Sequence, residues 1–267
     1  MWFMPKVKTI EEAKKVYKNL YFNNNLQKKS YVIEKWNNLY LPKLEEIIKN
    51  KNADQLLEAI ISSDFPPSGK SQTKIIKALT NFSVNFFTIM QLKKAHDSLG
   101  GSDVKNYIKH IWYRNSFLEI ERANNFEELK NISNYICSEE ETIDVLVSKW
   151  LNFCFNVKEI KKIKDFYHNK NFYDSDIFLK IETKKDSILF VEIPKAQDIE
   201  TIKNYYFLAS SRSATKILAF EKWLELCTTI EEADEAYVNA PKDKNICIIN
   251  AYKKVKSFFK EDIRERL

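Results

Sequence analysis

Glycine is scarce in this sequence, with only Gly69, Gly100 and Gly101 among 267 residues. Sheet-rich folds and nucleotide-binding loops use glycine where the backbone needs positive φ angles or a close approach, so its scarcity argues against both. The one Gly-Lys-Ser sequence, at 69–71, has Asp64 rather than glycine five positions earlier. It therefore lacks the pattern of a phosphate-binding loop, and we expect a turn between helices there.

Histidine and cysteine are also few. His96, His110 and His168 share no metal-ligand spacing, and no Ser/His/Asp or Cys/His arrangement is evident. The sequence therefore predicts a protein that is not an enzyme and has no metal site and no cofactor. The cysteines lie far apart within apolar stretches, where free core thiols are expected: Cys137, Cys154, Cys227 and Cys247.

Long apolar runs are missing as well. The first residues contain no apolar core of signal-peptide length, and no later run approaches the roughly 18 apolar residues that span a bilayer. With 44% hydrophobic and 30% charged residues, the composition is that of a folded, soluble chain. We expect a cytoplasmic location and no membrane partner.

The sequence does contain a weak repeat. Seven segments open with a polar residue that can cap a helix, followed by an apolar residue and, in most of them, by acidic residues. They start near residues 9, 52, 88, 125, 156, 198 and 229, at spacings of 31 to 43 residues. Counted from the residue after each start, every position at offsets zero, three and six is apolar or aromatic. This pattern predicts a helix with one buried stripe.

A polar or proline-containing break follows these first helices, and a second helix with its own stripe comes after it. The stripes of the second helices are clearest at Ile33, Trp36 and Leu39, at Val147, Trp150 and Phe153, and at Phe220, Trp223 and Leu226. The same spacing recurs at Ile76, Leu79 and Phe82 and at Ile249, Tyr252 and Val255. Because a lone hairpin cannot bury two stripes, we expect neighbouring hairpins to stack. Trp36, Trp150 and Trp223 are expected to fill the seams between them.

This unit of helix, short turn and helix resembles the hairpins of tetratricopeptide and HEAT repeats. The resemblance is architectural and covers nearly the whole chain. No specific repeat-family signature is satisfied, because the recurring tryptophan lies in the second helix and the first helices contain no glycine. The resemblance therefore implies no functional residue. It implies an all-α fold, a right-handed superhelical α-solenoid of about seven helix-turn-helix repeats that form a single domain over 1–267.

Residues 172–195 fit the repeat least well. If they are helical, Ile177, Leu179, Ile181 and Ile188 belong to the second helix of the fifth hairpin. If they are extended, they form a small β-hairpin inserted into the array. Their β-branched content favours the β-hairpin by a small margin.

The same segment holds the one enzymatic arrangement to be weighed. Asp176, Glu192 and Lys195 resemble the carboxylates and lysine of restriction-type nucleases, in which the carboxylates hold a divalent cation and the lysine assists the attacking water. Two residues rather than one separate Glu192 from Lys195, and one of them is Pro194, which would disturb a strand. A metal-dependent nuclease is therefore kept as the last alternative.

The net charge of +6 is unevenly distributed. Residues 1–123 carry 20 Lys and Arg against 12 Asp and Glu, and residues 124–267 carry 23 against 25. A basic half can bind nucleic acid, because lysines aligned on helices can follow a phosphate backbone. A lysine-rich composition without any binding role explains the same excess. The cations that would bind lie on the predicted second helices and their approaches: Lys28, Lys29, Lys35, Lys74, Lys77, Lys105, Lys109 and Arg114.

Function follows from the predicted architecture. Arrays of helical hairpins present an extended concave surface, and arrays without catalytic motifs mostly bind another protein or peptide. The sequence therefore predicts a non-catalytic scaffold for protein–protein interaction, with nucleic-acid binding as the alternative.

Overall fold

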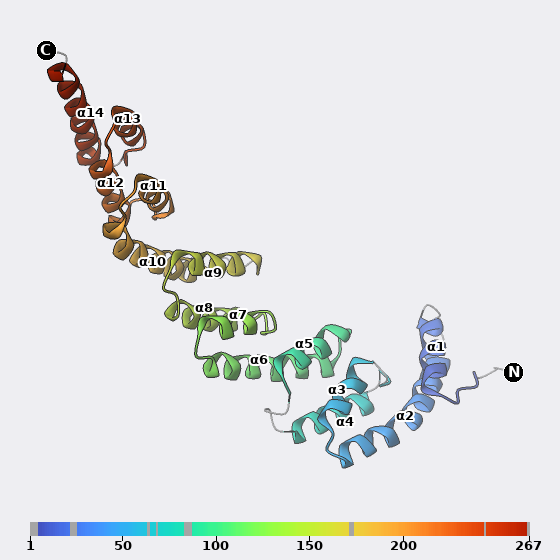
Figure 1. Ribbon diagram of the computed structural model, residues 1–267. Helices are drawn as coiled ribbons and strands as arrows, with labels where there is room; N and C mark the ends of the chain where they lie inside the picture. The colour runs from blue at the N-terminus through green and yellow to red at the C-terminus, as the bar shows by residue number, and fades with distance from the viewer. Residues whose placement is uncertain are drawn as a thin grey trace. The chain divides into compact units, whose positions relative to one another are not determined.

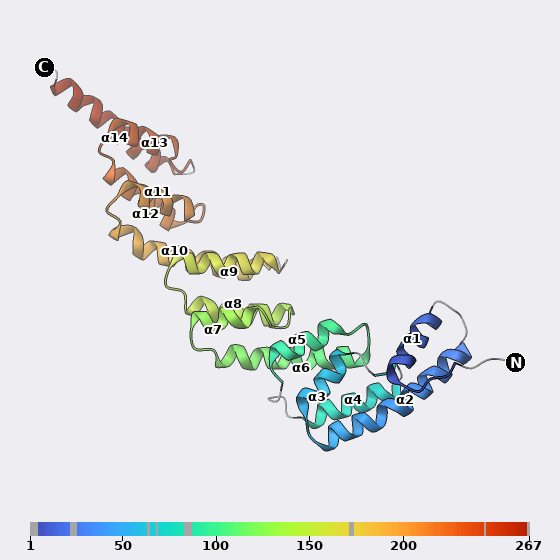
Figure 2. The same cartoon turned by 45° about the vertical axis from the view of Figure 1, so that its right-hand side comes forward.

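The computed structural model describes residues 5–21, 26–62, 65–67, 69–82, 87–170, 174–242 and 244–265 (Figure 1, Figure 2). Those residues form fourteen α-helices, one 3₁₀ helix over Ile193–Lys195 and no strand. The first seven helices are α1 (Ile10–Tyr21), α2 (Leu26–Lys49), α3 (Ala53–Ile61), α4 (Gly69–Asn81), α5 (Ile89–Ser98), α6 (Asp103–Arg122) and α7 (Phe126–Ser133). The last seven are α8 (Glu140–Asn152), α9 (Val157–Asn169), α10 (Ser175–Glu192), α11 (Ile199–Leu208), α12 (Ala214–Leu226), α13 (Ile230–Val238) and α14 (Asn245–Glu265).

Each of the seven predicted starts is the residue immediately before an odd-numbered helix. In all seven, the side-chain oxygen accepts the backbone N–H three residues on, as in Asn125, which caps α7 through the N–H of Glu128 at 2.9 Å. These bonds satisfy backbone donors that have no partner inside the helix. The predicted all-α class and the seven helix starts are confirmed.

The first helices bury the predicted stripe most completely at its middle position. That residue is at most 1% exposed in every one of them. The seven residues are Ala13, Leu56, Leu92, Leu129, Ile160, Ile202 and Ala233. The flanking stripe positions are buried or half-buried. A cap and a stripe that begins at the next residue therefore determine both where each helix begins and which face it buries.

The chain divides into two compact units, Met1–Leu146 and Val147–Leu267. In the first unit, α1 packs against α2 and α5 against α6, so these neighbours form hairpins. The second helices α2, α4 and α6 pack on one another in succession, and α3 packs on α2 and α5.

The second unit repeats this arrangement. Its hairpins are α9 with α10, α11 with α12 and α13 with α14, and both ribbon views show each pair side by side (Figure 1, Figure 2). The second helices α10, α12 and α14 again contact one another in succession. Packing is thus mostly between helices that are close in the sequence. That all seven hairpins form one domain stays a prediction.

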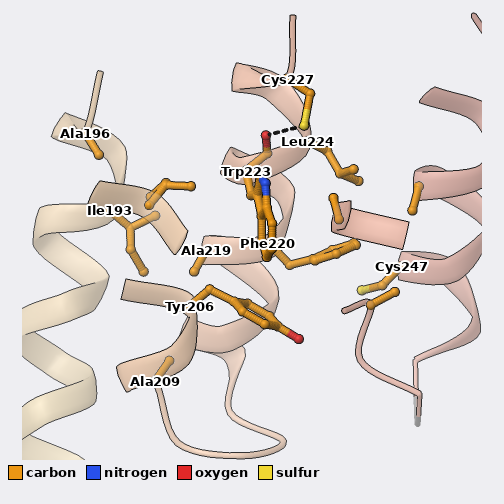
Figure 3. Packing of buried hydrophobic residues seen from close by; sticks show 14 of the residues in the cluster. Ile193, Ala196, Tyr206, Ala209, Ala219, Phe220, Trp223, Leu224, Cys227 and Cys247 are labelled. Atoms are coloured by element: carbon orange, nitrogen blue, oxygen red, sulfur yellow. Dashed lines mark hydrogen bonds between the residues drawn. The ribbon is translucent and has the colours of Figure 1, made fainter. Parts of the chain in front are cut away.

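The core of the second unit is built around Trp223, which is fully buried. Its ring lies 5.5 Å from that of Tyr206 on α11, centroid to centroid. Figure 3 shows Trp223 and Phe220 between Ile193, from the end of the preceding hairpin, and Cys247, from the following one. Three hairpins therefore share this core.

The other two recurring tryptophans are buried too, Trp36 at 5% and Trp150 at 2% exposure. Trp150 packs on Phe166 of the next hairpin, with ring centroids 5.6 Å apart. Trp36 packs on Tyr17 of its own hairpin, at 6.1 Å. Of these two aromatic contacts, only that of Trp150 therefore crosses from one hairpin to the next.

The β-hairpin predicted within 172–195 is wrong, since 175–192 is α10 and 193–195 is a 3₁₀ helix. The buried positions follow a four-residue spacing through this segment: Ile177, Ile181, Lys185, Leu189 and Ile193. A charged residue stands in the middle of that stripe, so the helical period is hidden when only apolar residues are counted. Leu179, which the helical alternative placed on the stripe, is instead 64% exposed.

Two smaller expectations also fail. In α14 the predicted stripe residues Ile249 and Tyr252 are exposed, while Cys247 and Ala251 are buried in their place. The turn expected at 69–71 is instead the first turn of α4, where the Ser71 hydroxyl is hydrogen-bonded to Asn37. In both places a small side chain lies at the helix contact: Cys247 and Ala251 in α14, and Ser71 in α4. Small side chains allow helices to pack closely.

All four cysteines are buried and free, as predicted. Burial raises the pKa of the Cys154 thiol to about 12 and that of Cys227 to about 11, which suppresses thiolate formation. None of the described helices is long and apolar enough to cross a membrane.

Candidate functional site

The eight cations proposed for nucleic-acid binding lie on α2, α4 and α6 of the first unit. Four are exposed, namely Lys35, Lys77, Lys109 and Arg114. Four are half-buried, namely Lys28, Lys29, Lys74 and Lys105.

Several of these cations interact within the chain. Lys74 forms an ion pair with Glu45, and Lys109 forms one with Glu139 at 2.5 Å. The Lys105 ammonium donates to the Leu99 carbonyl oxygen at 2.8 Å. Some of these cations are therefore already paired with carboxylates or hydrogen-bonded to the backbone of the first unit. Nucleic-acid binding by these residues stays a prediction.

Of the three nuclease-like residues, Asp176 lies far from the other two. Asp176 lies in the first turn of α10 and Glu192 is its last residue, which places their backbones about 24 Å apart at 1.5 Å per residue. Lys195 forms an ion pair with Glu192 at 2.8 Å. No group of three or more His, Cys, Asp or Glu side chains that could hold a metal occurs among the described residues.

The structure instead presents a groove in the second unit, lined by α9, α10, the end of α11 and the residues that follow it. Its volume is about 1160 Å³. We call it the α9–α11 groove. A smaller hollow of about 570 Å³, between α2 and α3 of the first unit, is lined mostly by polar side chains. The larger groove combines apolar and charged groups, which is typical of binding sites.

Apolar side chains line the α9–α11 groove without being covered. Phe155, just before α9, is 78% exposed, and Phe207 and Leu208, at the end of α11, are 59% and 44% exposed. Val157, Ile188 and Tyr205 are half-buried in its wall. Exposed apolar groups gathered around a groove mark a surface that a ligand can cover.

An ionic cluster forms one wall of the groove. The Glu182 carboxylate accepts hydrogen bonds from Lys164 of α9 at 2.8 Å, from the Ser210 hydroxyl at 2.9 Å and from Lys185, one turn along α10. Only 15% of the Glu182 side chain and 11% of the Lys185 side chain are exposed. The cluster thus ties three chain segments together where they meet at the groove.

The electrostatics of Glu182 reflect these partners. Burial by itself would raise the pKa of the carboxyl, but hydrogen bonds from Lys164, Lys185 and Ser210 outweigh it and lower the pKa from 4.5 to about 2. Glu182 is therefore ionised at neutral pH. Its single negative charge faces two lysines, of which Lys185 is largely shielded from water.

The loop after α11 is held in place by α10. The backbone N–H of Ser210 donates to the Asp186 carboxylate at 3.0 Å, and the Thr215 hydroxyl donates to the Asp186 carbonyl oxygen at 3.3 Å. These bonds place Phe207 and Leu208 beside the groove, because both residues immediately precede the anchored loop.

Of the groove residues, only Glu192 was named from the sequence as a candidate site residue, and then for the nuclease alternative rather than for a groove. One signal was available, since Lys185 stands between Ile181 and Leu189 on a four-residue stripe. A charge at a core position predicts a buried ion pair. Its ion-pair partner, Glu182, lies one turn earlier on the same helix, but Lys164, the second lysine paired with Glu182, comes from α9 and could not be identified without the tertiary structure.

Comparison with protein-family models, with curated proteins and with solved structures finds no match. The function of the α9–α11 groove is therefore inferred from its own chemistry.

Proposed function

We propose that this chain is a non-catalytic protein-interaction scaffold whose α9–α11 groove holds a peptide segment of another protein. The observation that carries the proposal is the exposure of Phe155, Phe207 and Leu208 around one groove. Fully burying a phenylalanine side chain is worth about 1.5–3 kcal/mol, so a ligand that covers these residues gains affinity from them. The anchored loop after α11 means that little ordering is required on binding.

The proposed architecture is a right-handed superhelical α-solenoid of seven hairpins. Sequential packing of second helices within each unit supports it. Small-angle X-ray scattering tests it, because a compact globule of 267 residues has a radius of gyration of about 18 Å. We expect a clearly larger value for an extended array. A measured value near that of the globule would contradict the solenoid.

Peptide binding is tested by selecting short random peptides, displayed on phage, against the whole chain. We expect enriched peptides to bind the Phe155→Ser variant at least about tenfold more weakly than the unchanged chain, because a central aromatic anchor is lost. The matched control is Phe190→Ser, which removes a 52% exposed phenylalanine on α10 outside the groove. It should bind the same peptides as the unchanged chain does.

Two results would contradict the proposal. One is a selection that enriches no peptide above background. The other is enriched peptides whose affinity falls equally with Phe190→Ser and Phe155→Ser. Circular dichroism of both variants verifies that each keeps its helical content.

A further inference from the structure

The groove face of α9 carries three lysines at three-residue spacing, Lys158, Lys161 and Lys164. Residues three apart on a helix lie about 5–6 Å apart at their Cβ atoms, so the three ammonium groups follow one side of the groove. Lys164 is engaged by Glu182. Lys158 and Lys161 are exposed, and neither forms an ion pair or hydrogen bond with the described residues.

The carboxylates of the groove do not balance these two cations. Glu182 is paired with two lysines, and Glu192 is paired with Lys195. Asp165 is the one other acidic residue in the lining. The groove wall therefore keeps a small excess of positive charge next to its exposed apolar residues.

The size of this excess limits the chemistry of the ligand. A polyanion such as a nucleic acid would bring a phosphate at every nucleotide to a surface that also carries Asp165, Glu182 and Glu192. A short segment with two or three acidic side chains matches Lys158 and Lys161 without that repulsion. Its apolar side chains would cover Phe155 and Phe207.

We propose that the α9–α11 groove binds an acidic peptide segment, with Asp or Glu side chains against Lys158 and Lys161 and an apolar side chain against Phe155 and Phe207. This inference rests on the proposed function, because it specifies the peptide that the same groove holds. The lysines set charge preference, and the phenylalanines contribute the burial of apolar area.

The experiment uses the displayed peptide library and the charge-reversed variant Lys158→Glu/Lys161→Glu of the whole chain. We expect peptides enriched on the unchanged chain to be acidic. They should bind the variant at least about tenfold more weakly, as measured by fluorescence anisotropy at low salt. The difference should shrink in 0.5 M salt, where the screening length is only a few ångströms. Replacing the Glu residues of a selected peptide by Gln should weaken its binding to the unchanged chain to a similar extent.

The matched control is Lys253→Glu/Lys256→Glu on α14. It reverses two exposed lysines that are also three residues apart, in the same unit but outside the groove. This variant should bind the selected peptides within about twofold of the unchanged chain, because distant exposed charges are screened. An equal loss for both double variants would overturn the proposal, since net charge rather than the groove would then determine affinity.

The outcomes separate this inference from the proposed function. Enriched peptides that are neutral or basic, depend on Phe155 and bind the Lys158→Glu/Lys161→Glu variant normally would overturn the acidic preference and leave the peptide groove standing. Absence of any Phe155-dependent peptide would overturn both. Tight binding of a labelled single-stranded RNA that the charge reversal abolishes, with no peptide enriched, would also overturn both and identify a nucleic-acid groove.

Discussion

Replacing Trp223 by alanine is expected to lower the free energy of unfolding by about 3–5 kcal/mol, the usual cost of removing a buried tryptophan from a core. The side chain is fully buried, and the core around it is shared by three hairpins. The gap left by the indole cannot be filled from one hairpin alone. Guanidinium denaturation followed by far-UV circular dichroism measures the change.

Trp223→Phe keeps an aromatic ring at this position and removes the indole nitrogen. The indole Nε1 of Trp223 has no hydrogen-bond partner among the described residues, so phenylalanine removes a buried donor together with some area. We expect a loss below about 1.5 kcal/mol, well under that of alanine. Phe190→Ala, at a 52% exposed position, serves as the control and should change stability by less than about 0.5 kcal/mol. A Trp223→Ala loss as small as that control would contradict the shared core.

Replacing Glu182 by glutamine is expected to lower stability at neutral pH by about 2–4 kcal/mol, because it leaves Lys164 and Lys185 without their counter-charge. The amide keeps the shape of the carboxylate, so the change reports mainly on charge. Glu200→Gln is the control, since Glu200 also forms an ion pair with a lysine, Lys203, but with 76% of its side chain exposed. It should cost about 0–1 kcal/mol.

The pH dependence tests the cause of the Glu182 effect. The pKa of Glu182 is lowered to about 2 in the folded chain from an ordinary 4.5, so its contribution is fully present above pH 4.5 and is lost as the pH falls towards 2. The difference in unfolding free energy between the unchanged chain and Glu182→Gln should therefore shrink over that range. Urea denaturation at several pH values between 7 and 3 measures it. A difference that stays constant down to pH 3 would contradict the charge explanation.

Helix positions were readable from the sequence because their determinants are local. A capping bond joins residues three apart, as from Thr229 to Glu232, and the stripe that begins at the next residue repeats every three or four residues. Both patterns fit within a single helix. Seven starts and the buried middle residue of each first helix could therefore be predicted without any knowledge of what packs against them.

The tertiary structure decided what depends on neighbouring helices. Lys185 occupies a core position because the Glu182 carboxylate, one turn earlier on α10, pairs with it, and Glu182 is also paired with Lys164 from another helix. The β-branched content of this segment favoured strands, and the charge of Lys185 interrupted the apolar stripe that would have indicated a helix. The groove likewise depends on the loop after α11 being bonded to Asp186, a contact 24 residues away in the chain. The sequence by itself determined where the helices begin and which face they bury. The tertiary structure decided how the buried charges are paired across helices and where apolar side chains stay exposed. These features depend on contacts between segments far apart in the chain, which no local pattern records.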